Sequence, residues 1–167
     1  MTTKRTTITS PIGRLLLVGD ERVLRGLYML DGPKPPAADP AWIEDAAAFA
    51  AVSEQLEQFF AGERTDFDVD VELTGTPFQQ RVWTALREIP YGQTISYGEL
   101  ARRIDQPSAV RAVGLANGRN PVSVIVPCHR VIGANGMLTG YGGGVERKRL
   151  LLDLEARAAT PRLLDLG

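Results

Sequence analysis

The sequence has 167 residues, with 19 Lys and Arg, 20 Asp and Glu, one Cys and one His. This length, with 44% hydrophobic residues, fits one domain or two small ones built around a core. A single Cys cannot form an internal disulfide, which favours a reducing compartment. One Cys and one His also exclude zinc fingers, zinc ribbons and His-rich metal centres, which take three or four such ligands.

Targeting signals are missing from the sequence pattern. The first residues carry no apolar region behind Lys4 and Arg5, so they do not resemble a signal peptide. The longest apolar stretch, residues 46–52, is far shorter than the ~20 residues that span a bilayer. We therefore expect a soluble, cytoplasmic protein without a membrane partner.

The charge is unevenly divided along the chain. Residues 1–75 hold 7 Lys and Arg against 13 Asp and Glu, a net charge of −6, whereas residues 76–167 hold 12 against 7, a net charge of +5. A chain with an acidic half and a basic half is typical of a protein whose basic half binds the phosphates of a nucleic acid. Charged side chains exposed to solvent are the alternative explanation of the same charge distribution.

The first half predicts a small sheet and one long helix. Two strands joined at Pro11-Ile12-Gly13 and a third strand are indicated at residues 6–10, 14–18 and 23–29. The proline-rich segment 31–40 reads as an irregular loop, and apolar residues at helical spacing predict a helix from Trp42 to Ala61. Residues 66–73 alternate acidic and apolar side chains, which predicts a strand with one buried face and one solvated, acidic face.

The second half reads as mostly helical. Thr76 as N-cap and Pro77 at the first position predict a helix that Pro90 closes. Two short helices, 97–104 opened by Ser96 and 109–118 capped by Ser108, are joined by a tight turn and suggest a helix-turn-helix. Further elements are a brief strand, a glycine-rich loop and a final helix, at residues 122–126, 140–144 and 145–157. Leu150, Leu151 and Leu154 are expected to face inward on that helix.

The one Cys and the one His are neighbours, at Cys128 and His129. A thiol reacts as its thiolate and needs a base or a positive charge nearby, which His129 and Arg130 could supply. Adjacent side chains on a regular strand point apart, so the backbone must turn at Cys128. Glu155 and Glu99 are the acids that could orient the imidazole. The alternative is a buried structural Cys beside a His bonded to the backbone.

A longer motif surrounds this pair. Asn120-Pro121 and Pro127-Cys128-His129-Arg130-Val131-Ile132 resemble the active-site signature of the O6-alkylguanine-DNA alkyltransferases, also called methylated-DNA–protein-cysteine methyltransferases. The resemblance covers most of residues 76–157, including 78–83, 95–97, 111–114, 117–120, 141–143 and Glu155. The first half fits the family more loosely.

The resemblance implies a reaction and the residues that perform it. Cys128 would take the alkyl group from a flipped O6-alkylguanine and keep it as a thioether, so that each molecule acts once. His129 would deprotonate Cys128 through a water, and Glu155 would hold His129. Tyr97 would donate to the purine, and Asn120 would fix the reactive turn; a half-buried aromatic and an ordinary Asn-Pro turn are the alternatives.

The resemblance also implies a DNA-binding surface and a pocket. Arg111 would fill the space left by the flipped base, while Ala109, Val110 and Gln106 would lie near the DNA backbone in the minor groove. A solvated Arg111, or one that contacts phosphate, is the alternative. The pocket would be walled by Tyr141, Gly142 and Val131. Some relatives bind a structural zinc in the first domain, but that half here contains neither Cys nor His, so no metal and no other cofactor is expected.

The predicted architecture is α+β. Residues 1–74 form a supporting domain with a small antiparallel sheet and one long helix, and residues 75–167 form a mostly helical, winged-helix-like domain. The expected partner is double-stranded DNA that contains O6-alkylguanine, and we expect the protein to bind it as a monomer. A cysteine hydrolase built on Cys128, His129 and Glu155 and a helix-turn-helix regulator with an inert Cys are the competing hypotheses.

Overall fold

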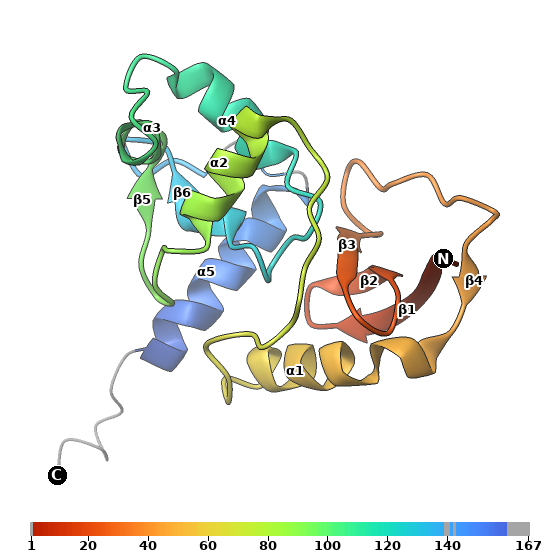
Figure 1. The fold of residues 1–167 in the computed structure, drawn as a ribbon. Coiled ribbons are helices and arrows are strands. Elements are labelled where there is room, and N and C mark those ends of the chain that lie inside the picture. Colours follow the sequence, from red (N-terminus) through yellow and green to blue (C-terminus); the bar gives the residue numbers. More distant parts are fainter. Residues whose placement is uncertain (1, 139–140, 142, 160–167) are drawn as a thin grey trace, which may run out of the picture.

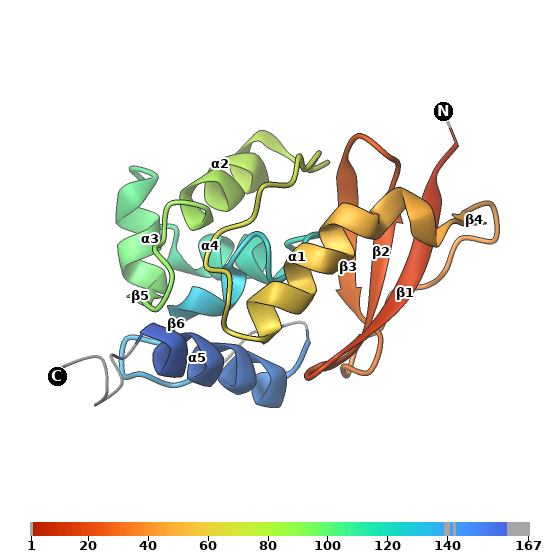
Figure 2. The same cartoon turned by 90° about the horizontal axis from the view of Figure 1, so that it is seen from below.

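The first part of the chain forms a four-stranded sheet covered on one face by a helix (Figures 1 and 2). In the computed structural model, which describes residues 2–138, 141 and 143–159, the strands lie in the order β3-β2-β1-β4. Their bounds are Lys4–Ser10 (β1), Gly13–Gly19 (β2), Leu24–Met29 (β3) and Ile43–Glu44 (β4). The β1–β2 and β2–β3 pairs are antiparallel, as predicted, but β4 pairs with β1 in parallel and makes the sheet mixed.

The predicted helix from Trp42 begins too early. Residues 43–44 extend the sheet instead, because the Ile43 amide donates to Thr3 and the Asp45 amide donates to Arg5 across the parallel pair. A 3-10 turn, Ala46–Phe49, follows with Asp45 as its N-cap, and the helix proper is Ala50–Phe60 (α1). Its buried face carries Leu56 and Phe59 onto the sheet.

Residues 66–73 keep the predicted alternation but do not form a regular strand. The acidic side chains are exposed, and the apolar ones are partly buried against the core. Backbone pairing is limited to one bridge, in which Leu24 donates to Asp70 and accepts from Glu72. The segment is thus an extended connector that runs between the two parts of the molecule (Figure 1).

The second part is mostly helical, as predicted. Its elements are Pro77–Leu86 (α2), Ile95–Ser96 (β5), Tyr97–Arg103 (α3), Val110–Gly118 (α4), the 3-10 turn Cys128–Arg130, Val131–Ile132 (β6) and Val145–Ala159 (α5). The strands β5 and β6 form a small parallel pair, and α5 lies beneath them (Figure 2). On α5, Leu151 is buried and Leu154 is partly buried, but Leu150 is half exposed, contrary to the prediction.

The helices α3 and α4 pack against each other as the predicted helix-turn-helix. The turn passes through Asp105 with a positive φ of 59°, and the Gln106 amide donates to Ala101. Ser108 is not the N-cap of the second helix, because α4 begins one residue later, with Ala109 in that position and no side-chain cap.

The predicted strand at residues 122–126 is a buried turn. The Val126 amide donates to Val122, and Val124 has a φ of 73°, a conformation that β-branched residues rarely adopt. The backbone of β3 holds this turn, since the Leu27 amide donates to Pro121 at 2.9 Å and the Leu27 carbonyl accepts from Ser123 at 3.2 Å. The first part of the chain therefore supports the segment that leads to Cys128.

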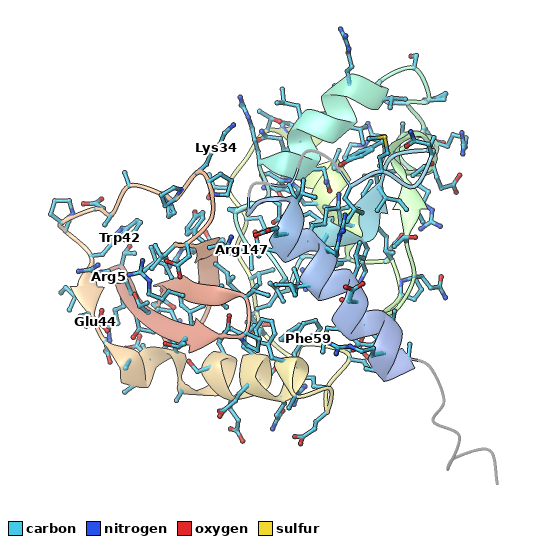
Figure 3. The ribbon with its side chains drawn as sticks, turned by 180° about the vertical axis from the view of Figure 1, so that it is seen from behind. Arg5, Lys34, Trp42, Glu44, Phe59 and Arg147 are labelled. Carbon is cyan, nitrogen blue, oxygen red and sulfur yellow. The ribbon has the colours of Figure 1, made fainter. Side chains whose placement is uncertain are left out.

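One continuous core joins the two parts, with buried residues from β2, β3, α1, α2, α4 and α5. Arg147 of α5 adds a polar contact by donating to the Ile12 carbonyl at 2.9 Å, and Figure 3 shows it between α5 and the sheet.

The domain boundary at residues 74–75 stays a prediction. Within residues 2–138, 141 and 143–159, no helix is long and apolar enough to cross a membrane.

The first testable prediction concerns the start of α2. Thr76 Oγ1 accepts from the Gln79 amide at 3.1 Å, and the Gln79 side chain accepts from the Thr76 amide at 3.0 Å, which completes a capping box. Thr76→Ala should lower the free energy of unfolding by about 1 kcal/mol in urea titrations. Thr84→Ala on the exposed face of the same helix is the matched control and should cause no loss. Equal losses in both variants would contradict a capping role.

Candidate active site

The chain reverses direction immediately before Cys128. Pro127 has φ −82° and ψ 62°, and the Cys128 amide donates to Val126 at 2.8 Å, which is an inverse γ-turn. Proline favours this geometry because its ring fixes φ near −65°. A 3-10 turn over Cys128–Arg130 follows, so that the side chains of Cys128 and His129 do not alternate as on a strand.

Two asparagines hold this turn from inside. Asn120 Nδ2 donates to the Val126 carbonyl at 2.8 Å, and Asn120 Oδ1 accepts from the Val122 amide at 3.0 Å. Asn117, which the sequence analysis did not single out, donates to the Cys128 carbonyl at 3.3 Å from α4. Both side chains are buried, so their hydrogen bonds fix the backbone on either side of the thiol.

The His129 imidazole is fully buried against Glu155 of α5. Its Nε2 lies 2.6 Å from Glu155 Oε2. The same carboxylate accepts from Arg130 Nε at 2.8 Å and Nη2 at 3.0 Å, and the Gly92 amide donates to it at 3.3 Å. Every lone-pair region of Glu155 is thus engaged, and Arg130 is committed to this carboxylate and to the Ile89 carbonyl. Arg130 therefore does not supply positive charge to the thiol.

The pKa shifts define the protonation state of this group. Burial alone would raise the pKa of Glu155, but the hydrogen bonds from His129 and Arg130 outweigh it and lower the pKa to about 2. Burial lowers the pKa of His129, so the ring is neutral beside an ionised carboxylate. Nε2 then carries the proton and Nδ1 is the basic nitrogen. Within the described residues, this buried Nδ1 has no hydrogen-bond partner.

Burial also raises the pKa of the Cys128 thiol, which is 4% exposed, while the Asn120 side chain and the Lys148 charge oppose that shift. The resting side chain is a neutral thiol, and it needs a base to become a thiolate.

Lys148 is a site residue that the sequence analysis missed. Its side chain is fully buried, and Nζ donates to the Val131 carbonyl at 2.5 Å and lies 5.7 Å from the centre of the Tyr97 ring. Burial lowers the pKa of Lys148 to about 8. A signal was present: Lys148, Leu151 and Glu155 follow one another at helical spacing and share the buried face of α5.

Tyr97 reaches this region because of the small parallel sheet. Ile95 pairs with Val131 and Ser96 pairs with Ile132, which places the first residue of α3 beside the segment after Cys128. Ser96 caps α3 by accepting from the Glu99 amide, but the Glu99 carboxylate binds Arg102 and Arg103 on the surface. Glu155, and not Glu99, is therefore the acid that meets His129.

A cavity of about 340 Å³ opens at Cys128. From the second part of the chain, Asn120, Ser123, Tyr141 and Gly143 contribute to its wall. Burial raises the pKa of Tyr141 well above its usual value, and its buried hydroxyl has no hydrogen-bond partner in the described residues. Val131 is buried in β6 and is not among the described residues that line this cavity, and Gly142 lies outside the described residues.

The predicted DNA-contacting residues cluster on the helix-turn-helix. Arg111 and Val110 are exposed on the first turn of α4, and Ala109 and Gln106 are partly exposed in the turn before it. They lie on the outer surface, whereas Cys128, His129 and Glu155 are buried beneath. Over residues 2–138, 141 and 143–159, no group of three or more His, Cys, Asp or Glu side chains could hold a metal ion.

Comparison with protein families agrees with this geometry. Residues 77–157 match the family model described as "6-O-methylguanine DNA methyltransferase, DNA binding domain". Residues 3–73 match the model described as "6-O-methylguanine DNA methyltransferase, ribonuclease-like domain".

Individual relatives cover nearly the whole chain. A methylated-DNA–protein-cysteine methyltransferase of Mycobacterium bovis is 58% identical over 153 residues, which is 92% of each chain. The crystal structure of the Mycobacterium tuberculosis O6-methylguanine methyltransferase is 53% identical, with a TM-score of 0.88 over 99% of this chain and 100% of that one. A crystal structure of the M. tuberculosis protein in complex with DNA is also 53% identical, with a TM-score of 0.87 over 100% of both chains.

The second prediction tests the buried carboxylate. Glu155→Gln should lower the free energy of unfolding at pH 7 by about 3 kcal/mol, because it leaves the Arg130 charge buried without a partner. Glu155 has a folded pKa of about 2 and an ordinary value of 4.5, so its stabilisation is complete above about pH 4.5 and is lost as the pH falls towards 2. Urea titrations between pH 7 and 3 should therefore show a shallower acid dependence in the variant.

The matched control for this experiment is Glu146→Gln, an exposed acid on the first turn of the same helix. It should leave both the stability and its acid dependence close to those of the parent protein. If the parent protein and Glu155→Gln lost stability in parallel as the pH fell, the depressed pKa of Glu155 would be wrong.

Proposed function

The chain belongs to the 6-O-methylguanine DNA methyltransferase family, and from this premise we propose that Cys128 is the residue that receives the alkyl group. The protein repairs DNA by transferring an alkyl group to a cysteine, and its sequence contains a single Cys. The substrate we propose is O6-alkylguanine in duplex DNA, with O4-alkylthymine as a second substrate.

The reaction is an in-line displacement at the alkyl carbon. His129 Nδ1 accepts the thiol proton through a water, the Cys128 sulfur forms a bond to the alkyl carbon, and the bond from that carbon to O6 breaks. Guanine leaves with the electron pair and takes up a proton. The product is a thioether, which is a poor leaving group, so the protein is consumed and each molecule acts once.

The observation that carries this proposal is the buried His129–Glu155 pair behind Cys128. Glu155 Oε2 lies 2.6 Å from His129 Nε2, which leaves Nδ1 as the base. When Nδ1 takes a proton, the ionised carboxylate stabilises the imidazolium cation that forms, as in the relay of a hydrolase triad. A thiol whose pKa is raised by burial needs this help to react at neutral pH.

Other residues orient the alkylated purine and the reactive turn at Cys128. Tyr97, at the start of α3, donates to the purine as negative charge develops on the leaving guanine. Asn120 holds the backbone of the turn through its bonds to Val122 and Val126. Ser123, Tyr141 and Gly143 line the pocket beside Cys128. The Tyr141 hydroxyl, which has no hydrogen-bond partner in the described residues, supports a polar contact to the purine.

In this proposal, DNA binds to the helix-turn-helix. We place α4 in the minor groove, with Arg111 filling the space left by the extruded base and with Ala109, Val110 and Gln106 along the DNA backbone. This arrangement suits recognition of damage rather than sequence, because minor-groove readout is degenerate. We also propose a monomer that works in the cytoplasm, where a reducing environment keeps the single thiol reactive.

The third prediction is that Cys128→Ala abolishes methyl transfer. Incubation of the parent protein with an O6-methylguanine duplex should add one methyl group to Cys128, as read by intact mass and peptide mapping. The variant should gain none, because it has no nucleophile, and it should still bind the duplex. A folded parent protein that gains no methyl group would overturn the proposal. Repeated turnover of an ester would indicate a hydrolase.

The fourth prediction concerns Arg111. Arg111→Ala should slow the repair of duplex DNA at least about tenfold and change the reaction with free O6-alkylguanine base by less than about twofold, because only duplex DNA requires base extrusion. Single-turnover rates with the two substrates measure both effects. Arg149→Ala, an exposed arginine on α5, is the control and should alter neither rate. Equal losses on both substrates would contradict the role of Arg111 in base flipping.

A further inference from the structure

The cavity at Cys128 is walled partly by the first part of the chain. Besides the residues already described, its lining includes Tyr28 and Met29 at the end of β3 and Lys34 and Pro36 in the loop that follows. Figure 3 shows Lys34 on this loop, on the side that faces the second part. None of these residues has a role in the mechanism above, although they border the space in which the transferred group must fit.

Met29 lies deepest of these four residues. Its side chain is 6% exposed and packs against Gly143 so closely that a Cβ atom added to Gly143 would overlap the Met29 sulfur. The same added atom would lie 2.9 Å from Cε2 of the Tyr141 ring. Met29 and Tyr141 thus meet at Gly143, beside the cavity that contains Cys128.

The loop after β3 also contacts the glycine loop directly. A Cβ atom on Gly32 would lie 3.0 Å from the Gly143 carbonyl oxygen, and one on Gly144 would lie 3.1 Å from Cδ of Pro33. Gly144 has a φ of 96°, which disfavours any side chain there. The two loops are in backbone contact, so the position of this wall depends on residues before and after the helical part.

We propose that Met29 sets the size of the alkyl group that the protein accepts. Methionine is unbranched and has a polarisable thioether, so it fills space closely but can be displaced by a larger group. A wall of this kind leaves a methyl group unhindered and opposes longer chains. The inference rests on the proposed function, since it concerns the group carried to Cys128. The chemistry is unchanged: the sulfur–carbon bond forms as the carbon–O6 bond breaks, and guanine leaves with the electron pair.

The test is a competition between two adducts in one tube. A duplex with O6-methylguanine and a matched duplex with O6-butylguanine, both in excess, are offered to the same protein, and the two products on Cys128 are counted by mass. Met29→Ala should raise the ratio of butyl to methyl product about tenfold, the scale by which removal of steric bulk alters selectivity in apolar pockets. A ratio measured within one sample does not depend on the fraction of variant that is folded.

Two controls accompany this variant. Met29→Leu conserves the volume and should leave the ratio within about twofold of the parent value. Met137→Ala removes a methionine that is 59% exposed and should leave the ratio unchanged.

The possible outcomes separate the two proposals. If the parent protein transfers the methyl group but Met29→Ala keeps the parent ratio, the role of Met29 is refuted and the proposed function stands. If the parent protein transfers neither group, the proposed function fails. A rise in the ratio for Met137→Ala equal to that for Met29→Ala would also refute the role, because the effect would not depend on the wall of the cavity.

Discussion

The Glu155 carboxylate is the interaction on which the rest of the reactive site depends. It is buried on α5, and it binds a neutral imidazole, a guanidinium group and a backbone amide together. An ionised carboxylate in the core is costly unless its hydrogen bonds are satisfied, and here they are. Because Arg130 balances its charge, Glu155 stays ionised beside a neutral His129. That pairing fixes the tautomer and presents Nδ1 as a base.

The reactive turn is held from three directions, and each direction restrains a different degree of freedom. Glu155 of α5 fixes the imidazole, Asn120 fixes the backbone before the thiol, and Leu27 of β3 pairs with the buried turn that contains Val124. A positive φ at a β-branched residue persists only where its surroundings determine it. The sheet of the first part is therefore a structural condition for the conformation at Cys128, although it carries none of the reacting groups.

The sequence predicted those features that depend on local patterns. The hairpin, the N-cap at Thr76, the helix-turn-helix and the grouping of Cys128 with His129 and Glu155 follow from turn residues, caps and a long motif. The sequence did not predict the features that depend on tertiary contacts. Ile43 and Glu44 joined a sheet edge instead of a helix, and Val122–Val126 was bent by Asn120 and Leu27. Lys148 was not identified from the sequence, because a buried lysine has no local signal except its place on the apolar face of its helix.

The division of charge between the two halves becomes intelligible once ion pairs are considered. In the first half, Lys4, Arg14 and Arg25 are each neutralised by a nearby carboxylate, so their charge does not reach a ligand. By contrast, Arg111 on α4 and Arg119, the C-cap residue of that helix, are exposed, and neither forms an ion pair within the described residues. A free guanidinium group keeps its full attraction for phosphate, and desolvating it breaks no existing pair. The unpaired positive charge of these two arginines therefore lies at the helix that we propose to bind DNA.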